Sequence, residues 1–217
     1  LKLLPNNKNT YHILLIDGVN NIDIYNANIE GDRDQHLDKQ GEWGMGIWIK
    51  HSENINLYSP KVTNCWGDGI YIGNQKNITS KNIFINNALV DNNRRNGISI
   101  ISGENITIKN TIVSNTNGTE PEAGVDIEPN TNNDDVKNII IENMGAIERF
   151  ELLEKDLIKI DGNPKVLILV GQNGSGKTTL LSSIIDAFYE FGNKLFEEVL
   201  PKDGMGYKYF KIYGGTN

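Results

Sequence analysis

The residues best suited to chemistry form a glycine-rich loop late in the chain. Residues 171–178 read GQNGSGKT and match the pattern G-x-x-x-x-G-K-[ST] in full. Such glycines let backbone amide groups point at phosphate oxygens, while Lys177 would reach the β- and γ-phosphates and Thr178 would bind Mg²⁺ through its hydroxyl. The pattern therefore predicts a site for ATP and Mg²⁺. Its residues are Gly171, Gln172, Asn173, Gly174, Ser175, Gly176, Lys177, Thr178 and Thr179.

The elements around this loop come in the order that a phosphate site requires. Residues 166–170 form an apolar run typical of a buried strand, and residues 177–191 carry the apolar stripe of a helix. A hairpin of strands 147–153 and 157–160 is predicted before this loop. Together with it, the segment GQNGSGKTTLL resembles the start of ABC-like ATPases of the structural-maintenance, recombination-repair and defence-system kind. This resemblance covers residues 146–217 and implies nucleotide binding by residues 171–179.

The same segment lacks the second half of an ATPase. No apolar strand ending in Asp-Glu follows the loop, and no LSGGQ-type signature is present. A P-loop core is a sheet covered by helices on both faces, which 74 residues with one long helix cannot complete. We therefore predict a partial α/β P-loop NTPase lobe that binds ATP but lacks residues needed for hydrolysis.

A second group of chemically capable residues recurs at regular spacing in the first two thirds of the chain. It has a column of outward-facing side chains, Trp48, Tyr71, Ser99 and Asp126, whose two aromatic members we expect to be exposed. The turns around these strands add Glu42, Asp68, Arg94, Arg95 and Glu128. Aromatic rings can cover the apolar faces of sugars while polar groups bind the hydroxyls, so a polysaccharide is the predicted partner.

The reaction on such a face stays open between several classes. We expect Asp68 and Asp126 two coils apart, with roughly 9–10 Å between their backbones, near the upper end for an inverting carboxylate pair. Arg94 and Arg95 could instead hold a uronate carboxylate, as a lyase or epimerase requires. The competing interpretation is that these charges form solvated ion pairs, that Trp66 packs in a turn, and that His36 lies in a surface loop.

Three short strands per coil must position these residues. Asn precedes alternating apolar residues at Asn21, Asn54, Asn82, Asn105 and Asn138, and Gly does so at Gly46, Gly69, Gly97 and Gly124. Spacings of 23 to 33 residues with Asn and Gly at the turns are typical of a parallel β-solenoid. Two inward columns then follow, namely Ile47, Ile70, Ile98 and Val125, and Ile49, Ile72, Ile100 and Ile127.

These repeats resemble the right-handed parallel β-helix superfamily of pectate lyases, polygalacturonases, uronate epimerases and phage tailspikes. The resemblance covers residues 11–143 and implies a β-helix of about five coils, with further coils expected at both ends. No complete catalytic motif of any one of these families is present. A non-catalytic glycan-binding solenoid therefore remains an alternative to a lyase, hydrolase or epimerase.

Asparagine marks a boundary between the two segments. Residues 1–143 contain 27 Asn and residues 144–217 only four, which predicts a β-helix domain over 1–143 and a truncated ATPase segment over 144–217. Either two modules are fused, naturally or by gene joining, or residues 144–160 cap the solenoid. ATP chemistry indicates a cytoplasmic protein, whereas glycan processing by β-helices indicates export.

Composition narrows the classes of partner. The net charge of -7 argues against nucleic acid and membrane surfaces, which attract clustered Lys and Arg. No apolar run reaches the roughly 18 residues of a membrane span. We therefore expect a nucleotide and possibly a polysaccharide as ligands, and no nucleic acid.

Overall fold

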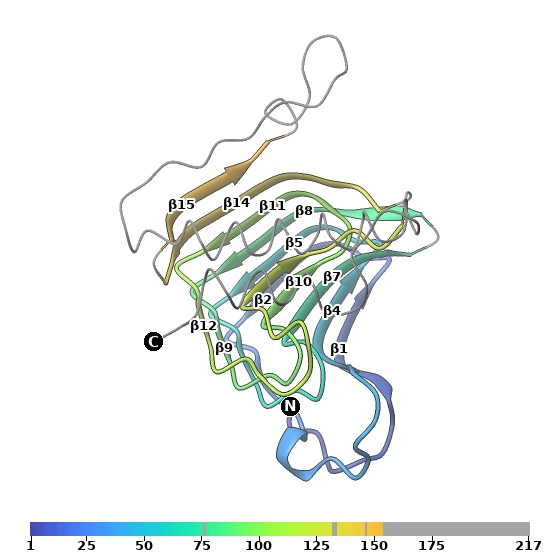
Figure 1. The fold of residues 1–217 in the computed structure, drawn as a ribbon. Helices are drawn as coiled ribbons and strands as arrows, with labels where there is room; N and C mark the ends of the chain where they lie inside the picture. Colours follow the sequence, from blue (N-terminus) through green and yellow to red (C-terminus); the bar gives the residue numbers. More distant parts are fainter. Residues whose placement is uncertain (76, 132–133, 146, 154–217) are drawn as a thin grey trace, which may run out of the picture. The chain divides into compact units, whose positions relative to one another are not determined.

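The computed structural model describes residues 1–75, 77–131, 134–145 and 147–153. Within these residues the chain winds through three stacks of short parallel strands (Figure 1). The first stack contains β1 (Thr10–Asp17), β4 (Trp43–Lys50), β7 (Ile70–Gln75), β10 (Ile98–Ile100) and β13 (Val125–Ile127). This succession of parallel strands at one strand per coil confirms the predicted solenoid.

The other two stacks complete each coil. The second contains β2 (Asn20–Tyr25), β5 (Glu53–Tyr58), β8 (Ile78–Asn86), β11 (Gly103–Lys109) and β14 (Val136–Met144). The third contains β3 (Asn28–Glu30), β6 (Lys61–Thr63), β9 (Leu89–Asp91) and β12 (Ile112–Ser114). β7 and β8 also pair antiparallel as a hairpin, which joins the first two stacks into one sheet.

Alternating side chains fill the interior, as the period of two predicts. Ile47 pairs in register with Ile70, and Ile70 with Ile98, and all three are fully buried. The column from Ile49 to Ile100 is equally buried. Val125 and Ile127 are only half-buried, because β13 is the last strand of the first stack among the described residues.

Asparagine turns the chain between the stacks. All five Asn residues of the repeat have φ between 52° and 59°, the left-handed region that Asn tolerates better than other residues with a Cβ. Asn82 shows the second contribution, since its amide donates to Asn54 Oδ1 and its own Oδ1 accepts from Asn105, both at 2.9 Å. The predicted role of Asn at the bends is confirmed.

The segment after the last coil adds one antiparallel strand. β15 (Ile147–Leu152) pairs with β14, and Arg149 forms ion pairs with Glu142 and Glu151. The expected first strand of the hairpin is therefore present, with β14 as its partner, which is the capping arrangement that the sequence left as an alternative. The expected strands 157–160 and 166–170, the phosphate loop 171–179 and the helix 177–191 lie outside the described residues.

Candidate functional site

The predicted outward column forms on the first stack. Trp48 pairs with Tyr71, Tyr71 with Ser99, and Ser99 with Asp126, each on the strand of the next coil. The expectation that its aromatic members are exposed is wrong, because Trp48 and Tyr71 are half-buried, and Ser99 and Asp126 are buried. Glu42 and Arg95, which come from the loops before β4 and β10, contact each other on this face, and Arg95 also contacts the buried Asp68.

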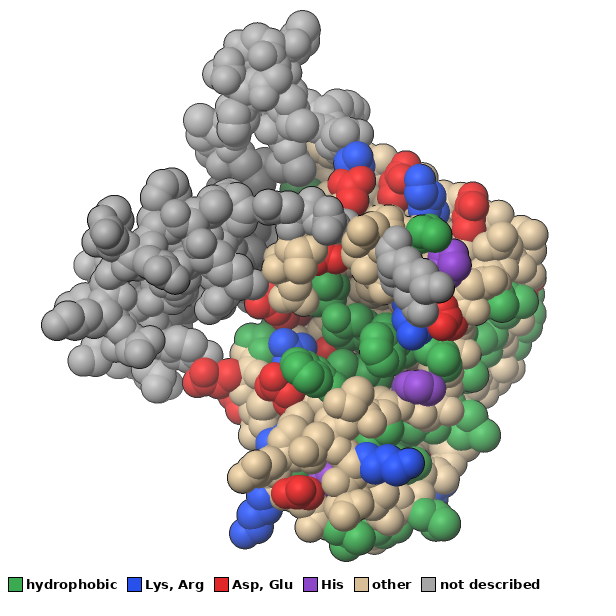
Figure 2. All heavy atoms as spheres, turned by 90° about the vertical axis from the view of Figure 1, so that its right-hand side faces the viewer, with side chains coloured by type: hydrophobic (Ala, Val, Ile, Leu, Met, Phe, Trp, Pro, Cys, Tyr) green, Lys and Arg blue, Asp and Glu red, His purple; other side chains and the backbone are tan. Residues whose placement is uncertain are grey.

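Aromatic rings occupy one half of the face. The rings of Trp48 and Tyr71 meet edge to face with centroids 5.4 Å apart, and His12 meets Trp48 in the same way at 5.9 Å. Lys50 Nζ lies 4.7 Å from the centroid of Trp48. Figure 2 shows hydrophobic side chains gathered at the middle of this side of the molecule, with acidic, basic and histidine side chains around them.

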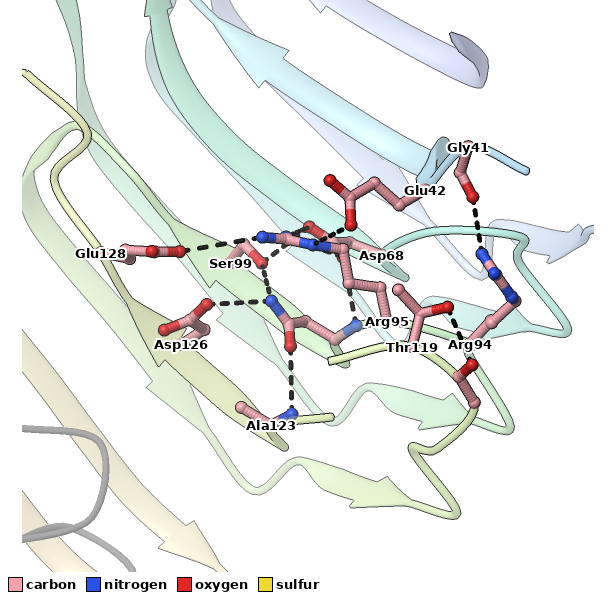
Figure 3. A network of polar contacts seen from close by, with 12 residues as sticks. Gly41, Glu42, Asp68, Arg94, Arg95, Ser99, Thr119, Ala123, Asp126 and Glu128 are labelled. Carbon is pink, nitrogen blue, oxygen red and sulfur yellow. Dashed lines mark hydrogen bonds and ion pairs between the residues drawn. The ribbon is translucent and has the colours of Figure 1, made fainter. Parts of the chain in front are cut away.

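A buried polar network occupies the other half, and Figure 3 shows its members converging. Asp68 is fully buried and accepts hydrogen bonds from Ser99 Oγ at 2.7 Å, from the backbone N–H of Asn96 at 3.1 Å and from Arg95 Nη1 at 3.1 and 3.3 Å. The Asn96 amide then donates to Ser99 Oγ at 3.1 Å and to Asp126 Oδ2 at 2.9 Å. Asn96 thereby links the two aspartates that the sequence places two coils apart.

Two more carboxylates close around the same arginine. Glu42 Oε2 lies 3.8 Å from Arg95 Nε, and Glu128 Oε2 lies 3.8 Å from Arg95 Nη2. The Arg95 side chain is 13% exposed, whereas Glu42 and Glu128 are 40% and 26% exposed. The glutamates are therefore the charged groups of this network that solvent, and hence a ligand, can reach.

Burial controls the protonation of the aspartates. Loss of water raises the pKa of Asp68 to about 6, although Arg95, Ser99 and the Asn96 N–H oppose the shift. Burial also raises the pKa of Asp126, although Arg95 opposes the shift. Both aspartates are therefore more readily protonated than an exposed carboxyl group, which suits them to give or take a proton.

Arg94 lies apart from this network, although the sequence grouped it with Arg95. Its Nη1 donates to the carbonyl oxygens of Gly41 at 2.7 Å and Trp66 at 3.4 Å, and its guanidinium carbon lies 3.8 Å from the Trp66 ring centroid. Trp66 is buried, as expected for a residue that packs in a turn. His36 lies in the loop that precedes β4, as expected, but its side chain is fully buried, with its ring 4.1 Å from that of Trp66.

The sequence missed Asn96, the central amide of the network. A usable signal was present, since Asn96 precedes Gly97 in the repeat where Asp68 precedes Gly69 one coil earlier. Extending the glycine repeat by one residue would have placed both side chains at one position of successive coils. The contributions of His12 and Lys50 to the aromatic half carry no comparable signal.

The described residues contain no metal site and no membrane-spanning helix. No group of three His, Cys, Asp or Glu side chains in that part of the chain has the geometry to hold a metal ion. No helix there is long and apolar enough to cross a bilayer. The predicted ATP and Mg²⁺ residues lie beyond it.

Comparison with known proteins identifies the fold alone. The family model of the right-handed β-helix region matches residues 6–118, which include β1 to β12 and most of the network around Asp68. No curated protein and no solved structure matches the chain.

Proposed function

The chain belongs to the right-handed β-helix family, and from this premise we propose that it binds a neutral polysaccharide on the outer face of β4, β7, β10 and β13. The observation that carries the proposal is the position of Trp48 and Tyr71 beside the network around Arg95 on one face. Half-buried rings give a sugar an apolar surface at small entropic cost, because they are already held. The exposed edges of Glu42 and Glu128 supply acceptors for sugar hydroxyls.

The charge of the site favours a neutral sugar over a uronate. Arg95 is in contact with three carboxylates, and Arg94 is committed to two backbone carbonyls and the Trp66 ring. A uronate would have to displace one of these partners, and it would meet repulsion from Glu42 and Glu128. This arrangement argues against a lyase or an epimerase, since both kinds of enzyme need a cation to hold the carboxylate of a uronate substrate.

Binding is tested by calorimetry against neutral polysaccharides of different linkage, with polygalacturonate as the acidic comparison. We expect saturable binding of a neutral polymer, weakened about tenfold or more by Trp48→Ala, equivalent to about 1.4 kcal/mol. Tyr25→Ala is the matched control, because Tyr25 is an exposed ring on β2 in the second stack. Tighter binding of polygalacturonate, or equal losses in the two variants, would overturn the proposal.

The same geometry supports hydrolysis as the accompanying reaction. Burial raises the pKa of Asp126, so this carboxyl group can hold a proton to give to a leaving group, and the partly exposed Glu42 can activate water. Turnover is measured as release of reducing ends, and Glu42→Gln should abolish it while leaving affinity within a few fold; unchanged turnover would exclude this role.

A second function rests on sequence alone and concerns other residues. The complete pattern at 171–178 supports binding of ATP with Mg²⁺ by the C-terminal segment, with Lys177 and Thr178 as the phosphate and metal contacts. The proposal covers binding of ATP with Mg²⁺ and does not extend to hydrolysis.

A further inference from the structure

Glu42 reaches the network from a long loop whose start is fixed in the protein interior. Residues 31–42 connect β3 to β4, and Asp32 near their start is buried. Its carboxylate accepts from Tyr11 Oη at 2.6 Å, from the Asn6 backbone and side-chain amides at 3.0 and 2.9 Å, and lies 2.9 Å from His36 Nδ1. A buried carboxylate with this many donors is held firmly, and it anchors the first half of the loop.

The middle of the loop rests on a three-layer stack. The His36 ring lies 4.1 Å from the Trp66 ring at an interplanar angle of 19°, and the Arg94 guanidinium carbon lies 3.8 Å from the centroid of the same ring. Two groups this close to one centroid must lie on opposite faces, so Trp66 is between them. Arg94 therefore packs against the residue that supports the loop.

Arg94 also binds the end of the loop directly. Its Nη1 donates to the Gly41 carbonyl at 2.7 Å, and Figure 3 shows it pointing toward Gly41 while Arg95 points into the carboxylates. Gly41 has φ of +89°, a conformation that L side chains rarely adopt, and a Cβ on it would lie 2.6 Å from that of Asn9. The peptide group held by Arg94 is the one immediately before Glu42, whose carboxylate lies 3.8 Å from Arg95 Nε.

We infer that Arg94 is a positioning residue, which holds the end of the 31–42 loop so that Glu42 stays against Arg95 on the polysaccharide face. This inference rests on the proposed function for its biological meaning, while the geometry that it claims can be tested without any glycan. The two adjacent arginines then have different roles. Arg95 contacts the carboxylates, and Arg94 holds the backbone next to Glu42, which carries one of those carboxylates. The loop becomes the element that sets which glycan fits beside Glu42.

The test is a double-mutant cycle read by two methods. NMR of the Arg95 Nε–H group reports its contact with Glu42, and calorimetry reports the affinity for the neutral polysaccharide. We expect Arg94→Gln and Glu42→Gln to shift the Arg95 Nε–H resonance in the same direction, with no further shift in the double variant. Arg149→Gln is the matched control, because Arg149 lies on β15 and contacts only Glu142 and Glu151 among the described residues.

The outcomes separate the two proposals. An Arg95 resonance that Arg94→Gln leaves unchanged, or shifts that add in the double variant, would overturn the positioning role. Absence of glycan binding by the wild type would overturn the proposed function and leave the NMR result to decide the role of Arg94. If Arg94→Gln fails to fold, Arg94→Lys replaces it. This variant keeps the charge and a hydrogen-bond donor but loses the planar stacking on Trp66. It should therefore give an intermediate shift of the Arg95 Nε–H resonance.

Discussion

Asp68 shows how a carboxylate can be buried in the wall of the solenoid. It has no exposed surface, and the removal of water disfavours its charge more than its partners restore it, so the pKa rises from 3.8 to about 6. Ser99, Arg95 and the Asn96 N–H occupy its acceptor positions. An ionised Asp68 is therefore tolerated at neutral pH, but a protonated one suits its surroundings better.

This shift predicts how stability depends on pH. Between about pH 4 and pH 6 the folded state binds a proton at Asp68 that the unfolded state has lost, so the stabilisation from this residue declines as pH rises. This difference in pKa between the folded and unfolded states corresponds to about 3 kcal/mol of stabilisation. We expect the free energy of unfolding of the wild type, measured with denaturant relative to that of Asp68→Asn, to fall by about 3 kcal/mol from pH 4 to pH 7. A difference between the two proteins that stays constant over this range would contradict the prediction.

Sequence reasoning located most of this site because the strand period is two. Trp48, Tyr71, Ser99 and Asp126 share a column for that reason alone. The different directions of Arg94 and Arg95 could not be predicted, because both lie in a turn where no period applies. Burial of Ser99 was missed for a related reason, since the side chains that cover it come from turns of neighbouring coils.

At the scale of elements, two features of asparagine stabilise the bends between strands: its tolerance of a left-handed backbone and its side-chain hydrogen bonds. Asn82 has φ of +52° and takes part in a ladder of side-chain hydrogen bonds with Asn54 and Asn105. The sequence predicts the left-handed backbone, since Asn favours it, and the register of the repeat then brings the amides of successive coils together. The 31–42 loop is about twice as long as the 64–69 and 92–97 loops at the same place in the next two coils, so the repeat could not predict its path.

Two substitutions at Asn82 should separate these contributions. Asn82→Gly removes the ladder bonds but accepts the backbone, and should lower the free energy of unfolding by about 1 kcal/mol. Asn82→Ala adds the strain of a positive φ, for a loss of about 2 kcal/mol or more. Asn77 is the control, because it has φ of +61° and no side-chain hydrogen-bond partner in the described part of the chain. Equal losses for Asn82→Gly and Asn77→Gly would show that the ladder contributes nothing.

At the scale of the whole chain, the described residues close the solenoid at one end. β15 runs antiparallel to β14 and covers its open edge, the protection that a repeat fold needs against further pairing. Among the described residues, seven of the ten exposed large hydrophobic side chains lie in residues 1–43, toward the first coil: Leu1, Leu4, Leu15, Val19, Tyr25, Leu37 and Trp43. β14 finishes at Met144, next to the position at which the Asn content drops.

The phosphate loop gives the last prediction, which concerns the complete chain. Calorimetric titration of Mg-ATP should show saturable binding that Lys177→Ala abolishes, because in the proposed site that ammonium would contact the phosphates, whose charge dominates the ligand. Lys165→Ala is a matched control, since it removes a lysine just before the apolar run 166–170 and outside the motif. Unchanged affinity in Lys177→Ala, or no binding by the wild type, would leave the face around Trp48 as the functional surface.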